Sequence, residues 1–117
     1  MTSGAAADEP LLPDPDHPGV IVYTPVRTGD GGYVSFVGGN WPVTLTVACT
    51  DDGSVDVTFT QFDVVLADFT VECPADAVGI GAEVIPEEEL DFGTIVVAVD
   101  ASSETIRWQS HLTDPDV

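Results

Sequence analysis

Residues 41–60 read WPVTLTVACTDDGSVDVTFT, and this stretch decides the fold. Apolar and polar residues alternate on both sides of DDGS, which is the period of strands that bury one face. The residues expected to face the core are Val43, Leu45, Val47 and Cys49 before the turn, and Val55, Val57 and Phe59 after it. The Asp52-Gly53 pair suits the positive φ angles of a tight turn, so the stretch predicts a β-hairpin.

Similar apolar segments lie on both sides of this stretch, separated by turn-forming sequences such as TGDGG, GGN and DASS. They cover residues 19–26, 32–38, 62–66, 69–73, 79–85, 93–100 and 104–112, with a break at Ala67-Asp68. Seven or eight strands in about 100 residues predict an all-β fold, a two-sheet antiparallel β-sandwich with an immunoglobulin-like architecture. One helical turn is expected in PEEEL (86–90), because proline and glutamate suit a helix N-terminus.

The 117 residues divide into one expected domain and two terminal segments. Residues 1–18 include most of DEPLLPDPDHPG (8–19), whose prolines favour extended backbone, and are expected to form an arm or tether. Residues 19–113 are expected to form the β-sandwich, and residues 114–117 an acidic tail. Two roles stay open for the arm's Leu11-Leu12 pair: part of a plain spacer, or a contact with a protein partner, a neighbouring subunit or this same domain.

The charge of the chain limits its partners. The sequence holds 21 acidic residues against two arginines and no lysine, a net charge of −19, yet 44% of its residues are hydrophobic, which is enough for a folded domain. Nucleic acid and anionic membranes attract basic residues, so both are excluded as direct partners. A basic protein surface, divalent cations or a salty medium remain compatible with this charge.

No targeting or membrane segment is expected from the sequence. No run reaches the roughly 18 apolar residues that span a bilayer, and the N-terminus lacks the basic and apolar parts of a signal peptide. Two cases stay open: a native Met1 with another route out of the cell, such as a virion or lysis, or a Met1 added to a mature exported chain.

The two cysteines fall in phase with the inward faces of their segments, Cys49 after Val47 and Cys73 after Val71. A disulfide between them is expected, and it would stabilise the fold by about 3 kcal/mol in the chain-entropy model. A pair of buried free thiols is the alternative. Because small exported domains depend on such bridges, the disulfide favours an extracytoplasmic location.

The order of several motifs resembles that of small extracytoplasmic β-sandwich domains of actinobacterial envelope and secreted proteins. The matching residues are Cys49, Asp52-Gly53, Phe69, Val71, Cys73-Pro74 and Arg107-Trp108, so the resemblance covers roughly residues 41–112. It implies a β-sandwich in the envelope or the secreted space and brings no catalytic residue with it. Most of those domains have no assigned function, and the missing signal peptide departs from their pattern.

The sequence predicts no enzyme. Its histidines are His17, in the arm, and His111, expected on the polar face of the last strand, and no G-x-S-x-G stretch exists. With both cysteines bridged, a zinc site lacks ligands. No cofactor is expected except weakly bound calcium, for which Asp51, Asp52 and Asp56 are the candidate ligands because calcium prefers carboxylate oxygens on loops.

The remaining aromatic candidates are the two tryptophans. Trp108 alternates with Ile106 and is expected in the core, whereas Trp41 starts a strand beside Pro42 and is a candidate for partner binding together with Leu11 and Leu12. The sequence thus predicts a non-enzymatic binding or structural module of the bacterial envelope or secreted space, docked or tethered through its arm. The alternative is a virion surface protein, as a capsid decoration or tail component, whose arm lies along a neighbouring subunit. A carboxylate-dependent hydrolase is a distant third.

Overall fold

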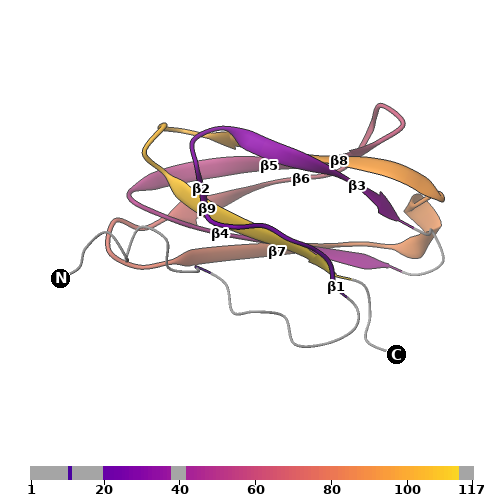
Figure 1. Cartoon of the computed structure of the whole chain (residues 1–117), viewed down its shortest axis with the longest axis horizontal. Helices are drawn as coiled ribbons and strands as arrows, with labels where there is room; N and C mark the ends of the chain where they lie inside the picture. The colour runs from indigo at the N-terminus through magenta and orange to yellow at the C-terminus, as the bar shows by residue number, and fades with distance from the viewer. Residues whose placement is uncertain (1–10, 12–19, 38–41, 114–117) are drawn as a thin grey trace.

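The computed structural model describes residues 11, 20–37 and 42–113, and within these the chain forms nine strands in two antiparallel sheets (Figure 1). Sheet A contains β1 (Val20–Tyr23), β2 (Arg27–Thr28), β4 (Val43–Thr50), β7 (Gly79–Ile85) and β9 (Arg107–Thr113). Sheet B contains β3 (Gly31–Val37), β5 (Gly53–Gln61), β6 (Val64–Cys73) and β8 (Gly93–Ala101). The sheets lie one above the other, so the predicted two-sheet antiparallel sandwich is confirmed.

The strand order is that of a jelly roll. Sheet A has the order β1-β9-β4-β7, with β2 also beside β9, and sheet B has the order β3-β8-β5-β6. From β2 onward every connection crosses from one sheet to the other except the β5–β6 connection. Immunoglobulin-like domains and jelly rolls share the sandwich architecture, and this order places the chain among the jelly rolls.

The hairpin predicted over residues 41–60 is wrong. β4 pairs with β7 and β9, and β5 pairs with β6 and β8, so the two strands belong to different sheets. The turn residues with positive φ are Asp51 (86°) and Asp52 (70°), one position before the expected pair. Their amides donate to the carbonyl of Pro74 at 3.0 and 3.3 Å, which fixes this corner between the sheets. Alternation identified the buried face of each strand correctly but carried no information about which strand lies beside it.

The hairpin of sheet B lies one connection later. Phe62 and Asp63 both have positive φ, 52° and 64°, and form the turn between β5 and β6. The segments predicted at 62–66 and 69–73 are therefore one strand preceded by a turn. The break expected at Ala67-Asp68 is absent from β6, where a bulge instead shifts the register, pairing Phe59 with Ala67 and the next residue with Val65.

The core lies between the sheets and contains the alternating residues that the sequence predicted. Its largest fully buried side chains are Trp108, Phe59, Leu45, Ile85, Ile95, Ile106 and Leu112. Trp108 donates from Nε1 to the carbonyl oxygen of Gly29 at 2.7 Å, so its polar atom is satisfied. The hydroxyl of Tyr33 lies 2.9 Å from Ser110 Oγ and links the sheets, and burial raises the pKa of Tyr33 to about 12.

Two smaller features complete the described chain. The helical turn expected at 86–90 is a 3-10 helix, η1 (Glu87–Glu89), preceded by Pro86. His111 is partly buried on the outer face of sheet A, where its ring meets Tyr23 edge-on at 6.2 Å. No helix among the described residues is long and apolar enough to cross a membrane.

Candidate ligand-binding face

An apolar row crosses the outer face of sheet B. Val34 of β3 lies opposite Val96 of β8, Val96 lies opposite Thr60 of β5, and Thr60 lies opposite Val65 of β6. Residues directly opposite one another in antiparallel strands point to the same face, so this row spans all four strands. Val34 is 66% exposed, Val96 44% and Val65 55%, although large apolar side chains are stabilised when they are removed from water.

Three exposed phenylalanines lie at the same end of sheet B. Phe36 is opposite Thr94, and its ring meets that of Phe92 edge-on with 4.8 Å between the ring centroids. The ring of Phe62 covers Gly93, because a Cβ placed there would lie only 2.8 Å from Phe62 Cζ. The rings remain exposed by 54% (Phe36), 61% (Phe62) and 69% (Phe92). We call the surface formed by Val34, Phe36, Phe62, Val65, Phe92 and Val96 the phenylalanine face.

A buried glutamine connects the two turns that carry Phe62 and Phe92. The side chain of Gln61, at the end of β5, is only 4% exposed. Its Oε1 accepts from the amide of Asp91 and its Nε2 donates to the carbonyl of Asp91, both at 2.8 Å. Gln61 precedes Phe62 and Asp91 precedes Phe92, so this pair of hydrogen bonds holds the two ring-bearing turns side by side. The backbone that carries these two rings is thus ordered before any ligand arrives, which reduces the ordering cost of binding.

The other end of the same outer face is acidic. Asp56 of β5 lies opposite Asp100 of β8, and its Oδ1 accepts a hydrogen bond from Thr70 Oγ1 at 2.6 Å. Asp30 accepts from the amide of Ala101 at 2.9 Å. A hydrogen bond to Asp30 and the charge of Asp30 raise the pKa of Asp100 above its usual value. One sheet face therefore carries an apolar half and a negatively charged half.

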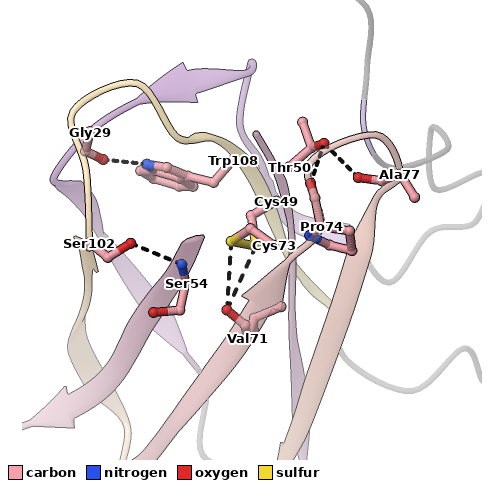
Figure 2. The surroundings of a disulfide bond; sticks show 10 residues. All are labelled: Gly29, Cys49, Thr50, Ser54, Val71, Cys73, Pro74, Ala77, Ser102 and Trp108. Carbon is pink, nitrogen blue, oxygen red and sulfur yellow. Dashed lines mark hydrogen bonds between the residues drawn. A yellow bond between two sulfur atoms is a disulfide. The ribbon is translucent and has the colours of Figure 1, made fainter. Parts of the chain in front are cut away.

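The predicted disulfide is confirmed. Cys49 and Cys73 are bonded, with 5.0 Å between their Cα atoms, and they join β4 of sheet A to β6 of sheet B (Figure 2). The carbonyl oxygen of Val71 lies 3.8 and 3.6 Å from the two sulfurs; a bonded sulfur has no hydrogen, so these are contacts and not hydrogen bonds. Thr50 Oγ1 bonds the carbonyls of Pro74 and Ala77 beside the bridge. The bridge stabilises the sandwich and lies away from the phenylalanine face.

The three calcium candidates have separate environments. Asp51 forms a two-point ion pair with Arg107, with Nε–Oδ2 and Nη2–Oδ1 distances of 2.6 and 3.0 Å, and this contact lowers the pKa of Asp51. Asp52 follows in the same turn, whereas Asp56 lies on the outer face of sheet B and binds Thr70. Across residues 20–37 and 42–113, no three His, Cys, Asp or Glu side chains are grouped so that they could hold a metal ion.

The predicted partner-binding residues are only partly described. Leu11 is partly buried, and its amide donates to Oε1 of Gln109 on β9 at 2.7 Å. Leu12 and Trp41 lie outside the described residues. Phe36, Phe62 and Phe92 were not among the site residues predicted from the sequence. A usable signal was present for the last two, because each stands beside an aspartate in a turn-forming stretch, where a core residue is not expected.

Comparison with known proteins bears on the fold. No protein-family model matches this sequence, and no curated protein sequence matches it. The chain is similar to a solved structure described as "CBM4 structure and function", a carbohydrate-binding module, with a TM-score of 0.60 and 12% sequence identity over 93% of this chain and 96% of the other. At this identity the likeness shows the β-sandwich fold alone. The resemblance to actinobacterial envelope domains stays a prediction.

Proposed function

We propose that this chain is a non-enzymatic binding module of an exported protein and that the phenylalanine face binds a carbohydrate. The observation that carries the proposal is the set of three exposed phenyl rings at one end of sheet B, next to the apolar row on its outer face. The likeness to a carbohydrate-binding module supports this ligand class, and the Cys49–Cys73 bridge fits an extracellular location.

The chemistry of the phenylalanine face suits a sugar ring. The C–H faces of a pyranose ring are apolar and pack against aromatic rings, which gain free energy when they leave water. Thr60 and Thr94 place hydroxyl groups between the apolar residues, where they can exchange hydrogen bonds with sugar hydroxyls. Such a mixture of apolar surface with a few polar groups is typical of ligand sites.

The charge of the chain narrows the class of carbohydrate. A net charge of −19, together with Asp30, Asp56 and Asp100 on the same sheet face, repels sulfated and uronic-acid polymers. Neutral polysaccharides and polymers of amino sugars are not repelled by this negative charge. The carboxylates also have local partners, Arg107 for Asp51 and Thr70 for Asp56, which supports a binding role over hydrolysis by paired carboxylates.

The test is affinity electrophoresis of the purified chain through gels that contain a neutral β-glucan, a xylan, glycol chitosan or alginate. We expect retardation by a neutral or amino-sugar polymer and none by alginate. Phe36→Ala and Phe92→Ala should each weaken the binding about 2- to 10-fold, since one aromatic contact contributes about 0.5–1.5 kcal/mol. Both residues are exposed, so the melting temperature should change little.

Ile80→Ala and Val84→Ala are the matched controls, because both side chains are similarly exposed, by 60% and 58%, on the outer face of sheet A. They should leave retardation unchanged. The proposal fails if no neutral or amino-sugar polymer retards the chain, or if the sheet A variants lose as much binding as the phenylalanine variants.

A further inference from the structure

The outer faces of the two sheets differ in how far they are covered. Ala98 on β8 and Ala48 on β4 both point outward from central strands, since the residues on either side of each in the strand face the core. Ala98 is exposed, whereas Ala48 is 0% exposed. Of the two residues beside Ala48 in the sheet, Ile80 is 60% exposed and Gln109 is buried.

Gln109 is buried at a place where a surface residue is expected. It points outward from β9 beside Ala48, yet it is only 3% exposed. Here β9 passes between its pairings with the two N-terminal strands, since Tyr23 is opposite His111 and Arg27 is opposite Trp108. A buried side-chain amide costs free energy unless its donor and acceptor are both hydrogen-bonded.

Both ends of that amide have partners from the N-terminal part of the chain. Nε2 donates to the carbonyl of Thr24 at 2.9 Å, and Thr24 is tied to β9 by two further hydrogen bonds with Ser110. Oε1 accepts from the amide of Leu11 at 2.7 Å, across 98 positions of sequence. Leu11 is partly buried, so the contact excludes water from one side of that residue.

We infer that the N-terminal arm docks on its own domain, with Leu11 seated beside Gln109 on the outer face of sheet A. Gln109 binds the arm because its Oε1 accepts a hydrogen bond from the backbone of Leu11 while its Nε2 donates one to the carbonyl of Thr24. Leu11 then lies on sheet A, on the side of the molecule opposite the outer face of sheet B. This inference concerns the opposite face of the molecule and does not rest on the proposed carbohydrate ligand.

The amide of Leu11 gives a direct test by hydrogen exchange, followed by NMR on the ¹⁵N-labelled full chain. A docked Leu11 amide should exchange at least about tenfold more slowly than in an unstructured peptide. Gln109→Leu keeps the volume but removes the acceptor, so the protection of Leu11 should be lost. Gln61→Leu is the matched control: it removes a second buried amide that also bonds a backbone amide, and it should leave Leu11 protected.

A second variant covers the case in which Gln109→Leu does not fold. Leu11→Pro removes the N–H donor of the arm and leaves Gln109 unchanged, and it should shift the side-chain amide resonances of Gln109 while those of Gln61 stay in place. Exchange of Leu11 at the unstructured rate in the parent chain overturns the inference, as do unmoved Gln109 resonances in Leu11→Pro. Protection that falls on dilution, together with a dimer in sedimentation, assigns the arm to a second copy and also overturns it.

Discussion

At the scale of single residues, Trp108 combines the packing and the hydrogen bonding of the core. Its ring is fully buried between the sheets, and Gly31 is a glycine next to it because a Cβ there would lie 2.9 Å from the ring atom Cζ2. Arg27 lies over the ring with its guanidinium carbon 6.0 Å from the centroid, a distance at which a cation and an aromatic face attract each other. Trp108 therefore ties β9 to the connection between β2 and β3.

Trp108→Phe should destabilise the fold by roughly 2–4 kcal/mol. The change leaves a cavity and removes the donor that satisfies the Gly29 carbonyl. Urea unfolding followed by circular dichroism measures the loss. Phe92→Leu is the control, since that ring is 69% exposed and its replacement should cost less than about 0.5 kcal/mol. Equal losses in the two variants would contradict the role given to Trp108.

Asp51→Asn should show a pH-dependent effect on stability. The contact with Arg107 lowers the pKa of Asp51 in the folded state, so the ion pair stabilises the fold above the ordinary pKa of 3.8 and ceases to do so as pH falls through the lowered value. Asparagine tolerates the positive φ of this position, so the turn survives. Unfolding at neutral pH should show a loss of about 0.5–1 kcal/mol that shrinks in strong acid. A loss that is constant with pH would refute the ion-pair explanation.

At the scale of elements, the edges of the two sheets approach each other where β6 meets β7. A Cβ on Gly79 would lie 2.0 Å from the carbonyl oxygen of Glu72, and one on Gly81 would lie 2.8 Å from a methyl group of Val71. The glycines of β7 thus let β6 pack closely against this edge. The disulfide, which attaches the end of β6 to β4, holds the same side of the sandwich closed.

Replacing both cysteines by alanine should cost about 2–5 kcal/mol, since the bridge closes a loop between positions 24 residues apart and restricts the unfolded chain. Urea midpoints of the double variant and of the parent, oxidised and reduced, provide the comparison. The reduced parent should fall close to the variant. If the variant and the oxidised parent unfold at the same midpoint, the bridge contributes nothing to equilibrium stability.

The alternation of residues in the sequence predicted which face of each strand is buried, but it did not predict which strands lie side by side. Alternation identified the buried residues of β4 and β5, and it placed Cys49, Cys73 and Trp108 correctly in the core. The same alternation arises whether consecutive strands pair or face each other across a core, so the β4–β5 hairpin was predicted wrongly. The phenylalanine face was missed for a related reason, because only the jelly-roll order brings β3, the β5–β6 turn and β8 together.

At the scale of the whole molecule, the net negative charge destabilises the folded state through repulsion between its carboxylates. The chain carries 21 acidic side chains against two basic ones, and the contact between Asp30 and Asp100 is one place where like charges meet. Salt shortens the range of this repulsion to about 8 Å at physiological ionic strength. The domain is therefore expected to depend on its ionic environment more than a neutral domain of the same fold.

Added sodium chloride should raise the melting temperature at neutral pH, because screening weakens the self-repulsion of the folded state. Scanning calorimetry across a salt series measures this. Calcium chloride at equal ionic strength is the companion experiment: a larger rise with calcium would indicate specific binding to carboxylates such as Asp51, Asp52 and Asp56, and an equal rise would indicate screening alone. A melting temperature independent of salt would contradict the expectation.

The pairing of the first and last strands has a consequence for how such a domain can be joined to other proteins. Val20 of β1 lies opposite Thr113 of β9, so the chain enters and leaves the sandwich about 5 Å apart, one strand spacing. A domain with adjacent entry and exit can be grafted into a surface loop of a host protein without stretching that loop. Both junctions belong to sheet A and lie at the end of the sandwich where sheet B carries the phenylalanine face, so the graft would bring that face close to the surface of its host.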